Sequence, residues 1–290
     1  MVAFAMTIGS PPTDEQGAPQ REVIHRHSLA VRLTHWINVL CLALLLMSGL
    51  AIFNAHPMLY WGHTGYRGMP FLLGIGSKTD NGRAVGITRI ADVDFDTTGV
   101  LGVSYDGNGR AQRRAFPSWL TLPSNAALAL ARDWHFLLAW LFVLNGAVYL
   151  GFSLVSGHVR RDLLPNADQL RARHVLSEIW DHLRLRAPRG EADRRYNILQ
   201  KFTYLLVLFG LLPVMVLSGL TMSPAVTAAA PLLFDLFGGR QSARTIHFIT
   251  ANLLVLFVLV HVLQVLVSGA FNRMRAMITG RYVIRPERAS

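Results

Sequence analysis

Residues 244–268 constrain this chain more than any other segment, because they are almost uniformly apolar and still contain two histidines. A helix of about 20 residues, rising 1.5 Å per residue, crosses the hydrocarbon core of a bilayer. His247 and His261 are 14 positions apart (261 − 247), which is almost four helical turns. Both therefore lie near one face of the helix, roughly 21 Å apart along its axis. Ionisable side chains at two depths of one span predict two functional sites, because such side chains are costly in a membrane.

The composition indicates an integral membrane protein. The chain is 52% hydrophobic and only 16% charged, below the quarter that is usual for soluble domains. The apolar residues gather in four segments, which predicts an all-α bundle of four transmembrane helices within a membrane domain at 29–270. The lone cysteine, Cys41, lies in an apolar run, which excludes disulfides, cysteine-ligated zinc and iron–sulfur clusters. A bend is expected at Pro213 in the third span. The predicted spans are residues 33–53, 129–156, 198–222 and 244–268.

The arginines predict the orientation of the chain. The net charge is +11, and because most arginines flank the spans, the positive-inside rule explains it without nucleic acid. Nine arginines lie in residues 158–197 and five follow residue 268, whereas the loop 223–243 holds one. The 158–197 loop and both termini are therefore predicted to be cytoplasmic. The termini are expected to be a disordered tail at 1–28 and a second tail at 271–290.

The remaining loop, residues 54–128, is then on the outer side. At about 75 residues it is too long for a bare connection, so it predicts a small structured cap. Residues 105–109, Tyr-Asp-Gly-Asn-Gly, predict a hairpin turn within it. This cap could dock an extramembrane partner, or it could be a lid that only shields the outer face.

Four histidines form two depth-matched pairs when the direction of each span is followed. His35 begins the first span on the cytoplasmic side, and His135 lies near the outer end of the second. In the fourth span, His247 is outer and His261 is inner. The sequence therefore predicts that His135 pairs with His247 and His35 with His261. Each pair joins two helices, as in an axial bis-histidine haem held inside a bundle.

Two other interpretations of these histidines compete with haem. A single histidine in a span can be a hydrogen-bonded packing residue, although two depth-matched pairs are harder to explain in that way. Zinc requires a tetrahedral ligand set, and each layer offers two histidines without Cys, Asp or Glu at the same depth. The exception is Asp133, which is two residues from His135 and faces another side of the helix.

Arginines accompany three of the four histidines at a spacing of three residues, which places both side chains on one helix face. In each case the arginine is on the watery side, where a guanidinium can pair with anionic haem propionates. Membrane-boundary anchoring is the alternative, and it is the favoured interpretation for Arg32 alone. The pairs are Arg32 with His35, Arg132 with His135, and Arg244 with His247.

The first and third spans share a Ser-Gly-Leu motif near their outer ends, at Gly49 and Gly219. Each glycine removes a side chain at the depth of the outer histidines, where a flat macrocycle needs room. Close packing between helices explains such glycines equally well.

These motifs resemble the prokaryotic cytochrome b561 superfamily, which includes the b-type cytochrome subunits of nickel–iron hydrogenase and formate dehydrogenase. The similarity covers about 33–53 and 129–270, and it includes His35-Trp36, both Ser-Gly-Leu motifs and Tyr196-Asn197. The long 54–128 loop departs from the compact members and indicates the branch found with periplasmic molybdopterin oxidoreductases. The resemblance implies a multi-pass protein of the bacterial inner membrane that moves electrons between the quinone pool and a periplasmic enzyme. It also implies two b haems, ligated by His35, His135, His247 and His261.

The sequence thus predicts a di-haem electron conduit without a catalytic side chain of its own, since haem performs the redox chemistry. We expect quinone near the inner haem, with Asn38, Tyr196 and Lys201 as candidates, although interfacial anchoring or helix capping is the favoured interpretation of each one singly. One rival is a stand-alone quinone-linked oxidoreductase acting on superoxide or a ferric substrate. The other is a non-redox membrane anchor whose histidines only pack.

Overall fold

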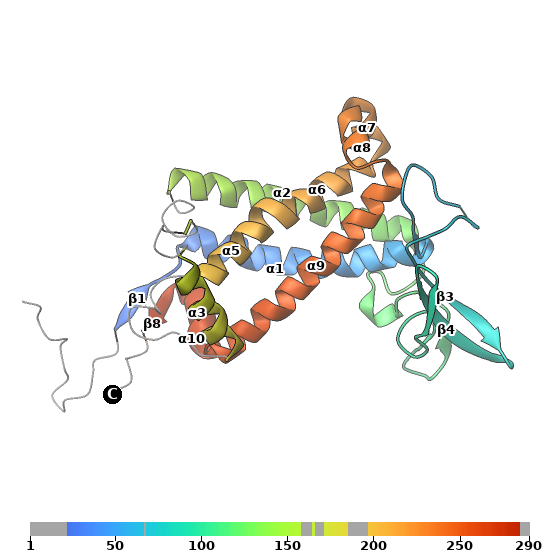
Figure 1. The fold of residues 1–290 in the computed structure, drawn as a ribbon, viewed down its shortest axis with the longest axis horizontal. Coiled ribbons are helices and arrows are strands. Elements are labelled where there is room, and N and C mark those ends of the chain that lie inside the picture. The colour runs from blue at the N-terminus through green and yellow to red at the C-terminus, as the bar shows by residue number, and fades with distance from the viewer. Residues whose placement is uncertain (1–21, 67, 158–163, 166–170, 185–196, 285–290) are drawn as a thin grey trace, which may run out of the picture. The chain divides into compact units, whose positions relative to one another are not determined.

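The computed structural model describes residues 22–66, 68–157, 164–165, 171–184 and 197–284. The chain divides into two compact units. The larger unit comprises residues 33–154 and 205–259, and the smaller unit comprises residues 1–32, 155–204 and 260–290. The described residues are mostly helical, and four helices are long and apolar enough to cross a membrane (Figure 1): Leu29–Ala55, Leu128–Val155, Ile198–Thr221 and Arg240–Val267.

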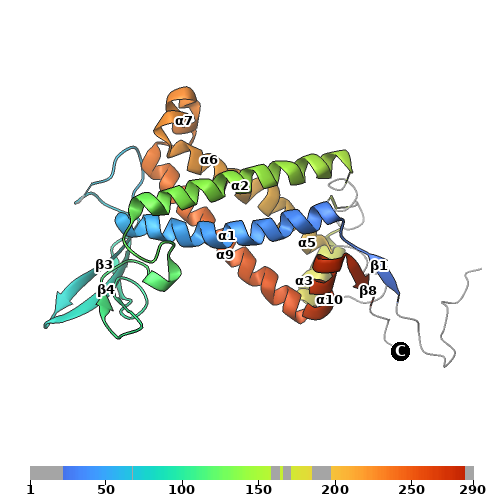
Figure 2. The same cartoon turned by 180° about the vertical axis from the view of Figure 1, so that it is seen from behind.

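Three of the predicted spans are single helices. Helix α1 (Leu29–Ala55) begins one turn before the predicted 33–53, α2 (Leu128–Val155) matches 129–156 closely, and α9 (Arg240–Val267) begins one turn before residue 244. Within the larger unit, α1 and α2 run side by side in both views (Figures 1 and 2). Their long, continuous apolar runs are what a bilayer requires, because every backbone polar group must be bonded inside the helix.

The third span contains a π-helical turn directly before the predicted bend at Pro213. Helix α5 (Ile198–Leu206) leads into the π-helical segment η3 (Val207–Leu211), and α6 (Leu212–Thr221) follows. Proline has no N–H to donate to the carbonyl four residues earlier, and its ring crowds that carbonyl. The wider π turn is the local adjustment that lets the helix continue past the proline.

A β-rich cap follows α1, as predicted for residues 54–128. Its main sheet has the antiparallel order β2–β3–β4–β5. At the β3–β4 turn, Asn81 and Gly82 have φ of 47° and 79°, as a type I′ hairpin requires. The strands are β2 (Met58–Leu59), β3 (Leu73–Asp80), β4 (Arg83–Ile90) and β5 (Val93–Asp96).

The predicted hairpin at 105–109 is confirmed. Strand β6 (Ser104–Tyr105) pairs with β7 (Ala111–Gln112) across this turn. The 3-10 turn η1 (Ser118–Leu120) follows, and the short helices α7 (Pro224–Ala229) and α8 (Pro231–Leu236) connect α6 to α9.

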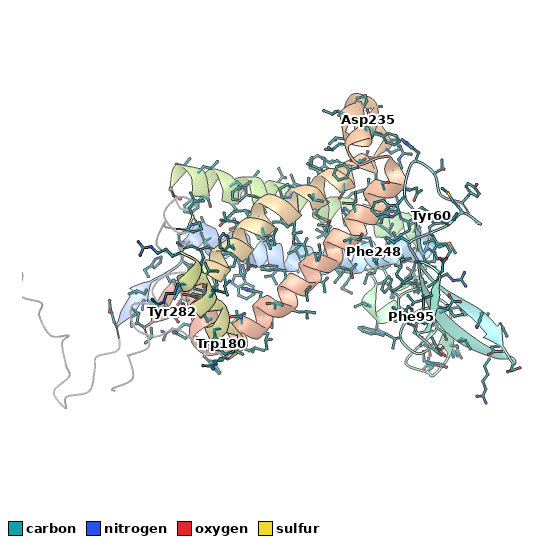
Figure 3. All side chains as sticks on the ribbon, viewed as in Figure 1. Tyr60, Phe95, Trp180, Asp235, Phe248 and Tyr282 are labelled. Atoms are coloured by element: carbon teal, nitrogen blue, oxygen red, sulfur yellow. The ribbon has the colours of Figure 1, made fainter. Side chains whose placement is uncertain are left out.

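The cap packs directly on the helices of the larger unit. Phe53 at the end of α1 is buried with Leu59, Ile75 and Ala115 of the cap. The Phe53 ring stacks on Phe248 of α9, with centroids 4.8 Å apart. Figure 3 shows Phe248 on α9 and Tyr60 close to the junction of helices and sheet. One small core thus joins cap and helices.

In the smaller unit, residues 22–28 do not match the expectation of a disordered tail at 1–28. Residues 1–21 lie outside the described residues, but strand β1 (Val23–His25) pairs antiparallel with β8 (Arg281–Val283). Tyr282 is fully buried there, with the guanidinium carbon of Arg26 4.4 Å from its ring centroid. Because the partner strand is at the opposite end of the chain, no local pattern indicates the pairing.

Two further helices belong to the smaller unit. Helix α10 (Ala270–Thr279) lies, apart from its first residue, within the predicted 271–290 tail. Helix α3 (Ala172–Leu183) lies within the predicted 158–197 loop, most of whose other residues are outside the described part of the chain.

Candidate functional site

The larger unit brings His135 of α2 and His247 of α9 together. Their ring centroids are 6.3 Å apart, and their planes are inclined by 66°. Two imidazoles on opposite sides of one metal ion have bonds of about 2 Å and a further distance of about 1 Å from each nitrogen to its ring centroid, or about 6 Å in all. The observed separation therefore suits a single metal ion held between the two rings.

The hydrogen bonds of His247 determine which of its nitrogens is available to a metal. Its Nδ1 lies 3.0 Å from the carbonyl oxygen of Met215 and 3.1 Å from Oγ of Ser218. A carbonyl oxygen only accepts hydrogen bonds, so Nδ1 carries the proton and donates it. Nε2 then has the free lone pair that a metal needs.

The hydrogen bonds between α2 and α1 likewise leave Nε2 of His135 available to a metal. Its Nδ1 lies 3.0 Å from Oγ of Ser48. The Ser48 hydroxyl donates to the carbonyl of Leu44 at 2.8 Å, so its lone pair is the one that accepts from Nδ1. The Ser48 hydroxyl also lies 3.1 Å from the carbonyl oxygen of Leu45, three residues earlier in α1. Both outer histidines are thus tied through Nδ1.

Gly49 and Gly219 make room for these imidazole rings. A Cβ at Gly49 would lie 3.4 Å from Cε1 of His135, and one at Gly219 would lie 3.3 Å from Cε1 of His247. The sequence suggested that these glycines leave space for a macrocycle, whereas in the structure their neighbour is the histidine ring. Their contribution to holding a cofactor stays a prediction.

The two outer arginines have different surroundings. The guanidinium of Arg244 donates to the carbonyls of Met58, at 3.0 Å, and of His56. Arg132 is exposed and contacts the Phe136 ring at 5.7 Å. Among the residues that the structure describes, Arg132 makes no hydrogen bond or ion pair. The propionate role predicted for both arginines therefore suits Arg132 better than Arg244.

His56 directly follows α1 and lies at the same junction between the cap and the helices. Burial lowers its pKa below the usual value, and the positive charge of Arg244 lowers it further. His56 therefore favours its neutral form while the cap is packed on the helices.

The histidines predicted for the inner site belong to different compact units. His35 belongs to the larger unit, and its ring meets Trp36 edge-on at 5.5 Å. The neighbouring Thr34 carbonyl accepts a hydrogen bond from Asn145 at 2.8 Å, and Asn145 also donates to Asn38 at 2.7 Å. His261 belongs to the smaller unit. The pairing of His35 with His261 stays a prediction.

The other candidates for the inner haem and quinone sites belong to the smaller unit or lie outside the described residues. Arg32 donates to the Ile278 carbonyl at 2.5 Å. Lys201 is buried, and its ammonium donates to the Leu164 carbonyl at 3.0 Å. Tyr196 lies outside the described residues.

The donor set favours a metal that brings its own equatorial ligands. No group of three or more His, Cys, Asp or Glu side chains that could hold a metal ion occurs among the described residues. Two histidines alone do not complete a tetrahedral zinc site. Two axial imidazoles are, however, all that a porphyrin-bound iron requires.

Sequence reasoning missed the two serines that bond to these histidines, Ser48 and Ser218. It also missed Asn145, which donates to Asn38 and to the carbonyl of Thr34, the residue before His35. The signal for the serines was present, because each directly precedes a glycine of the shared Ser-Gly-Leu motif. Asn145 also had a signal, since an amide within an apolar span is costly unless it has a partner.

Comparison with known proteins identifies the family. The profile of the family described as prokaryotic cytochrome b561 matches residues 26–280. The chain belongs to this family. Membership implies haem b and a membrane protein that transfers electrons, which the tied histidine pair suits. The chain is also 28% identical over 245 residues to the putative protein-methionine-sulfoxide reductase subunit YedZ1 of Azospira oryzae, covering 84% of this chain and 92% of that protein. No solved structure matches.

Proposed function

We propose that this cytochrome b561 protein is a di-haem subunit that transfers electrons across the bacterial inner membrane, from quinol to a periplasmic oxidoreductase. The observation that carries the proposal is the pair His135 and His247, whose rings are 6.3 Å apart and tied through Nδ1. The assignment of the second haem to His35 and His261 rests on their depths in the sequence.

The protein's own residues would hold and orient the cofactor. Haem b supplies one-electron redox chemistry at its iron when bound. His135 and His247 present Nε2 as ligands, and Ser48, Ser218 and the Met215 carbonyl keep both rings in that tautomer. Exposed Arg132, one helical turn from His135, provides a cation for an anionic propionate.

The chemistry in the relative's name supports one direction of electron flow. Reduction of a methionine sulfoxide to the thioether and water takes two electrons and two protons, and oxidation of a quinol to the quinone releases the same number of each. A chain with 84% of its length aligned to such a reductase subunit supports flow from the membrane to the outer face. The proposed partner is therefore a periplasmic reductase of protein methionine sulfoxide, of the molybdopterin class that the sequence indicates.

The cap suits a fixed docking platform better than a mobile lid, because several hydrogen bonds join it to the ends of α1 and α9. Asn54 exchanges two bonds with the backbone of Phe116, at 3.2 and 2.7 Å. Thr245 of α9 donates to the Tyr60 carbonyl at 2.7 Å, and the Ser242 hydroxyl accepts from Gly62 N–H at 2.7 Å. A lid that opens would break all of these bonds.

An apolar face of the cap sheet is left exposed by the part of the chain that the structure describes. Ile90 of β4 stands opposite Val93 of β5, and Phe95 lies two residues further along the same face. Their side chains are 47%, 56% and 48% exposed. We place the partner subunit here, because the face belongs to the platform that is joined to the outer histidines by α9 and α1.

Reconstitution tests the proposed function. The detergent-purified chain should bind two haems, be reduced by a menaquinol analogue, and be reoxidised by the partner subunit with a sulfoxide peptide. A Phe95→Asp variant should keep quinol reduction and lose reoxidation by the partner. The matched control is Asp94→Asn, a charge removal on the same exposed strand that should keep both steps.

Each rival has its own signature in this assay. A chain without visible-range absorbance after haem supplementation would be the non-redox anchor. Reoxidation by superoxide or a ferric chelate at full rate without any partner would identify the stand-alone oxidoreductase. Either result overturns the proposal.

A further inference from the structure

We propose that Ser48 and Ser218 are positioning residues, which hold the two outer histidines in one tautomer and one ring rotation and so set the redox potential of the iron between them. The inference rests on the proposed bis-histidine haem and goes beyond it, because it gives control of a redox potential to two side chains that would act on the iron only through its histidine ligands.

The serines belong to a structure that occurs twice. We call it the imidazole socket: a backbone carbonyl, a serine three residues later, and a glycine directly after the serine. The α1 socket is Leu45, Ser48 and Gly49, and it receives His135. The α6 socket is Met215, Ser218 and Gly219, and it receives His247.

The geometry of the two sockets agrees closely. The distances from serine Oγ to Nδ1 are 3.0 and 3.1 Å, and the virtual Cβ to Cε1 distances are 3.4 and 3.3 Å. The sockets lie on different helices and receive histidines from two other helices. Such agreement at two independent places indicates a shared requirement of the histidines rather than an accident of packing.

Neither serine hydroxyl needs a histidine to complete its hydrogen bonds. A buried helical serine commonly bonds to a carbonyl three or four residues earlier, and both do so: Ser48 to Leu44 at 2.8 Å and Ser218 to Met215 at 3.2 Å. Thr221 lies one turn after Ser218, is equally buried, and satisfies its hydroxyl with the Leu217 carbonyl at 2.8 Å. Ordinary packing therefore explains the Thr221 hydroxyl, but not the approach of both serines to Nδ1.

An acceptor at Nδ1 changes the ligand strength of the opposite nitrogen. A histidine that donates Nδ1–H becomes a more basic ligand through Nε2, which favours the ferric over the ferrous iron. Two off-centre bonds, from Ser218 and the Met215 carbonyl, also fix the rotation of the His247 ring, and the Ser48 bond restrains the His135 ring; together they hold the angle of 66° between the planes. Loss of either serine should therefore raise the midpoint potential and loosen the ring angle.

The test compares Ser48→Ala and Ser218→Ala with Thr221→Val in the full-length haem-loaded protein. Spectroelectrochemical titration should show one of two midpoint potentials raised in each serine variant, raised further in the double variant, and unchanged in Thr221→Val. The ferric low-spin electron paramagnetic resonance signal of that haem should broaden or shift in the same variants. Ser218→Cys, which keeps a weak acceptor, should lie between wild type and alanine, and it replaces Ser218→Ala if that variant does not accumulate.

Two failures can be told apart. Two haems per chain with unmoved potentials and spectra in both serine variants, or equal shifts in Thr221→Val, overturn the positioning role alone. Absence of haem from the wild-type chain, or full haem content in His135→Ala and His247→Ala, overturns the proposed function beneath it.

Discussion

The two halves of the outer histidine site have matching imidazole sockets, but their arginines make different contacts. In the half built from α1 and α2, Ser48 and Gly49 receive His135, and Arg132 on α2 is exposed. In the half built from α6 and α9, the corresponding socket receives His247, but Arg244 is bonded to carbonyls of the cap.

The difference separates two kinds of requirement. The serine and glycine contacts recur in both halves at nearly equal distances, so they reflect a requirement that both histidines share. A single haem iron between the two rings would impose such a requirement. The arginines share only their place in sequence, three residues before each histidine. Arg244 connects helix and cap, whereas Arg132 is available to an anion. Sequence spacing alone could not distinguish these roles.

The largest expected effect is the loss of a haem. His135→Ala and His247→Ala should each reduce the haem content from two per chain to one, and the double variant should do no more, because the proposed function has both rings ligate the same iron. Pyridine haemochrome content per chain measures this. His63→Ala is the control, since this cap histidine contacts Phe234 at 5.1 Å and should keep both haems. Additive losses in the double variant would show that the two histidines serve different haems.

The second-largest effect concerns the arginines, whose substitutions should have different consequences. Arg244→Gln removes charged donors from two cap carbonyls and should cost about 3 kcal/mol of stability, which a thermal unfolding midpoint can detect. Arg132→Gln should leave that midpoint unchanged and lower the outer haem potential, because a nearby positive charge favours the reduced form. Identical behaviour of the two variants would remove the distinction between the halves.

A smaller effect concerns the socket glycines. Gly219→Ala and Gly49→Ala should each disturb a histidine ring at a cost of about 1 kcal/mol or more, with the tighter Gly219 affected more. Gly146→Ala and Gly151→Ala in α2 meet nothing within 4 Å and should be neutral or stabilising. Retention of haem during dilution or heating provides the comparison. Equal haem retention in all four variants would contradict the socket.

The smallest effect is on pH dependence at the cap. The pKa of His56 is lowered in the folded protein, so the unfolded chain binds more protons and stability falls as pH drops through the unfolded value of about 6.5. The unfolding midpoint should therefore decrease between about pH 7.5 and about pH 5.5, and less so in His56→Gln. Arg244→Gln should also reduce this dependence, since it removes one cause of the shift. A steeper dependence in either variant would contradict this explanation.

The helices were predictable because their cause is local. Long apolar runs set the length of α1, α2 and α9 to within about a turn, and the proline in the third span marked the place of the π turn. The β3–β4 hairpin was also locally encoded in Asn81-Gly82 but was overlooked in a segment without clear alternation.

Features that join distant segments were not predictable from pattern. The β1–β8 pairing joins opposite ends of the chain. Arg244 of α9 donates a hydrogen bond to a carbonyl of the cap, which follows α1 and is therefore distant in the sequence. The meeting of His135 and His247 was predicted from depth alone, because the span directions fixed their level. The serines that hold them required knowledge of how the helices are rotated, which spacing within one helix does not contain.

The most direct test of the central claim is low-temperature electron paramagnetic resonance of the oxidised, detergent-purified protein. Imidazole planes inclined by 66° predict a highly anisotropic low-spin ferric signal, which disappears in His247→Ala. A high-spin signal in the wild-type protein, or a low-spin signal that survives this substitution unchanged, would show that His135 and His247 do not hold an iron between them.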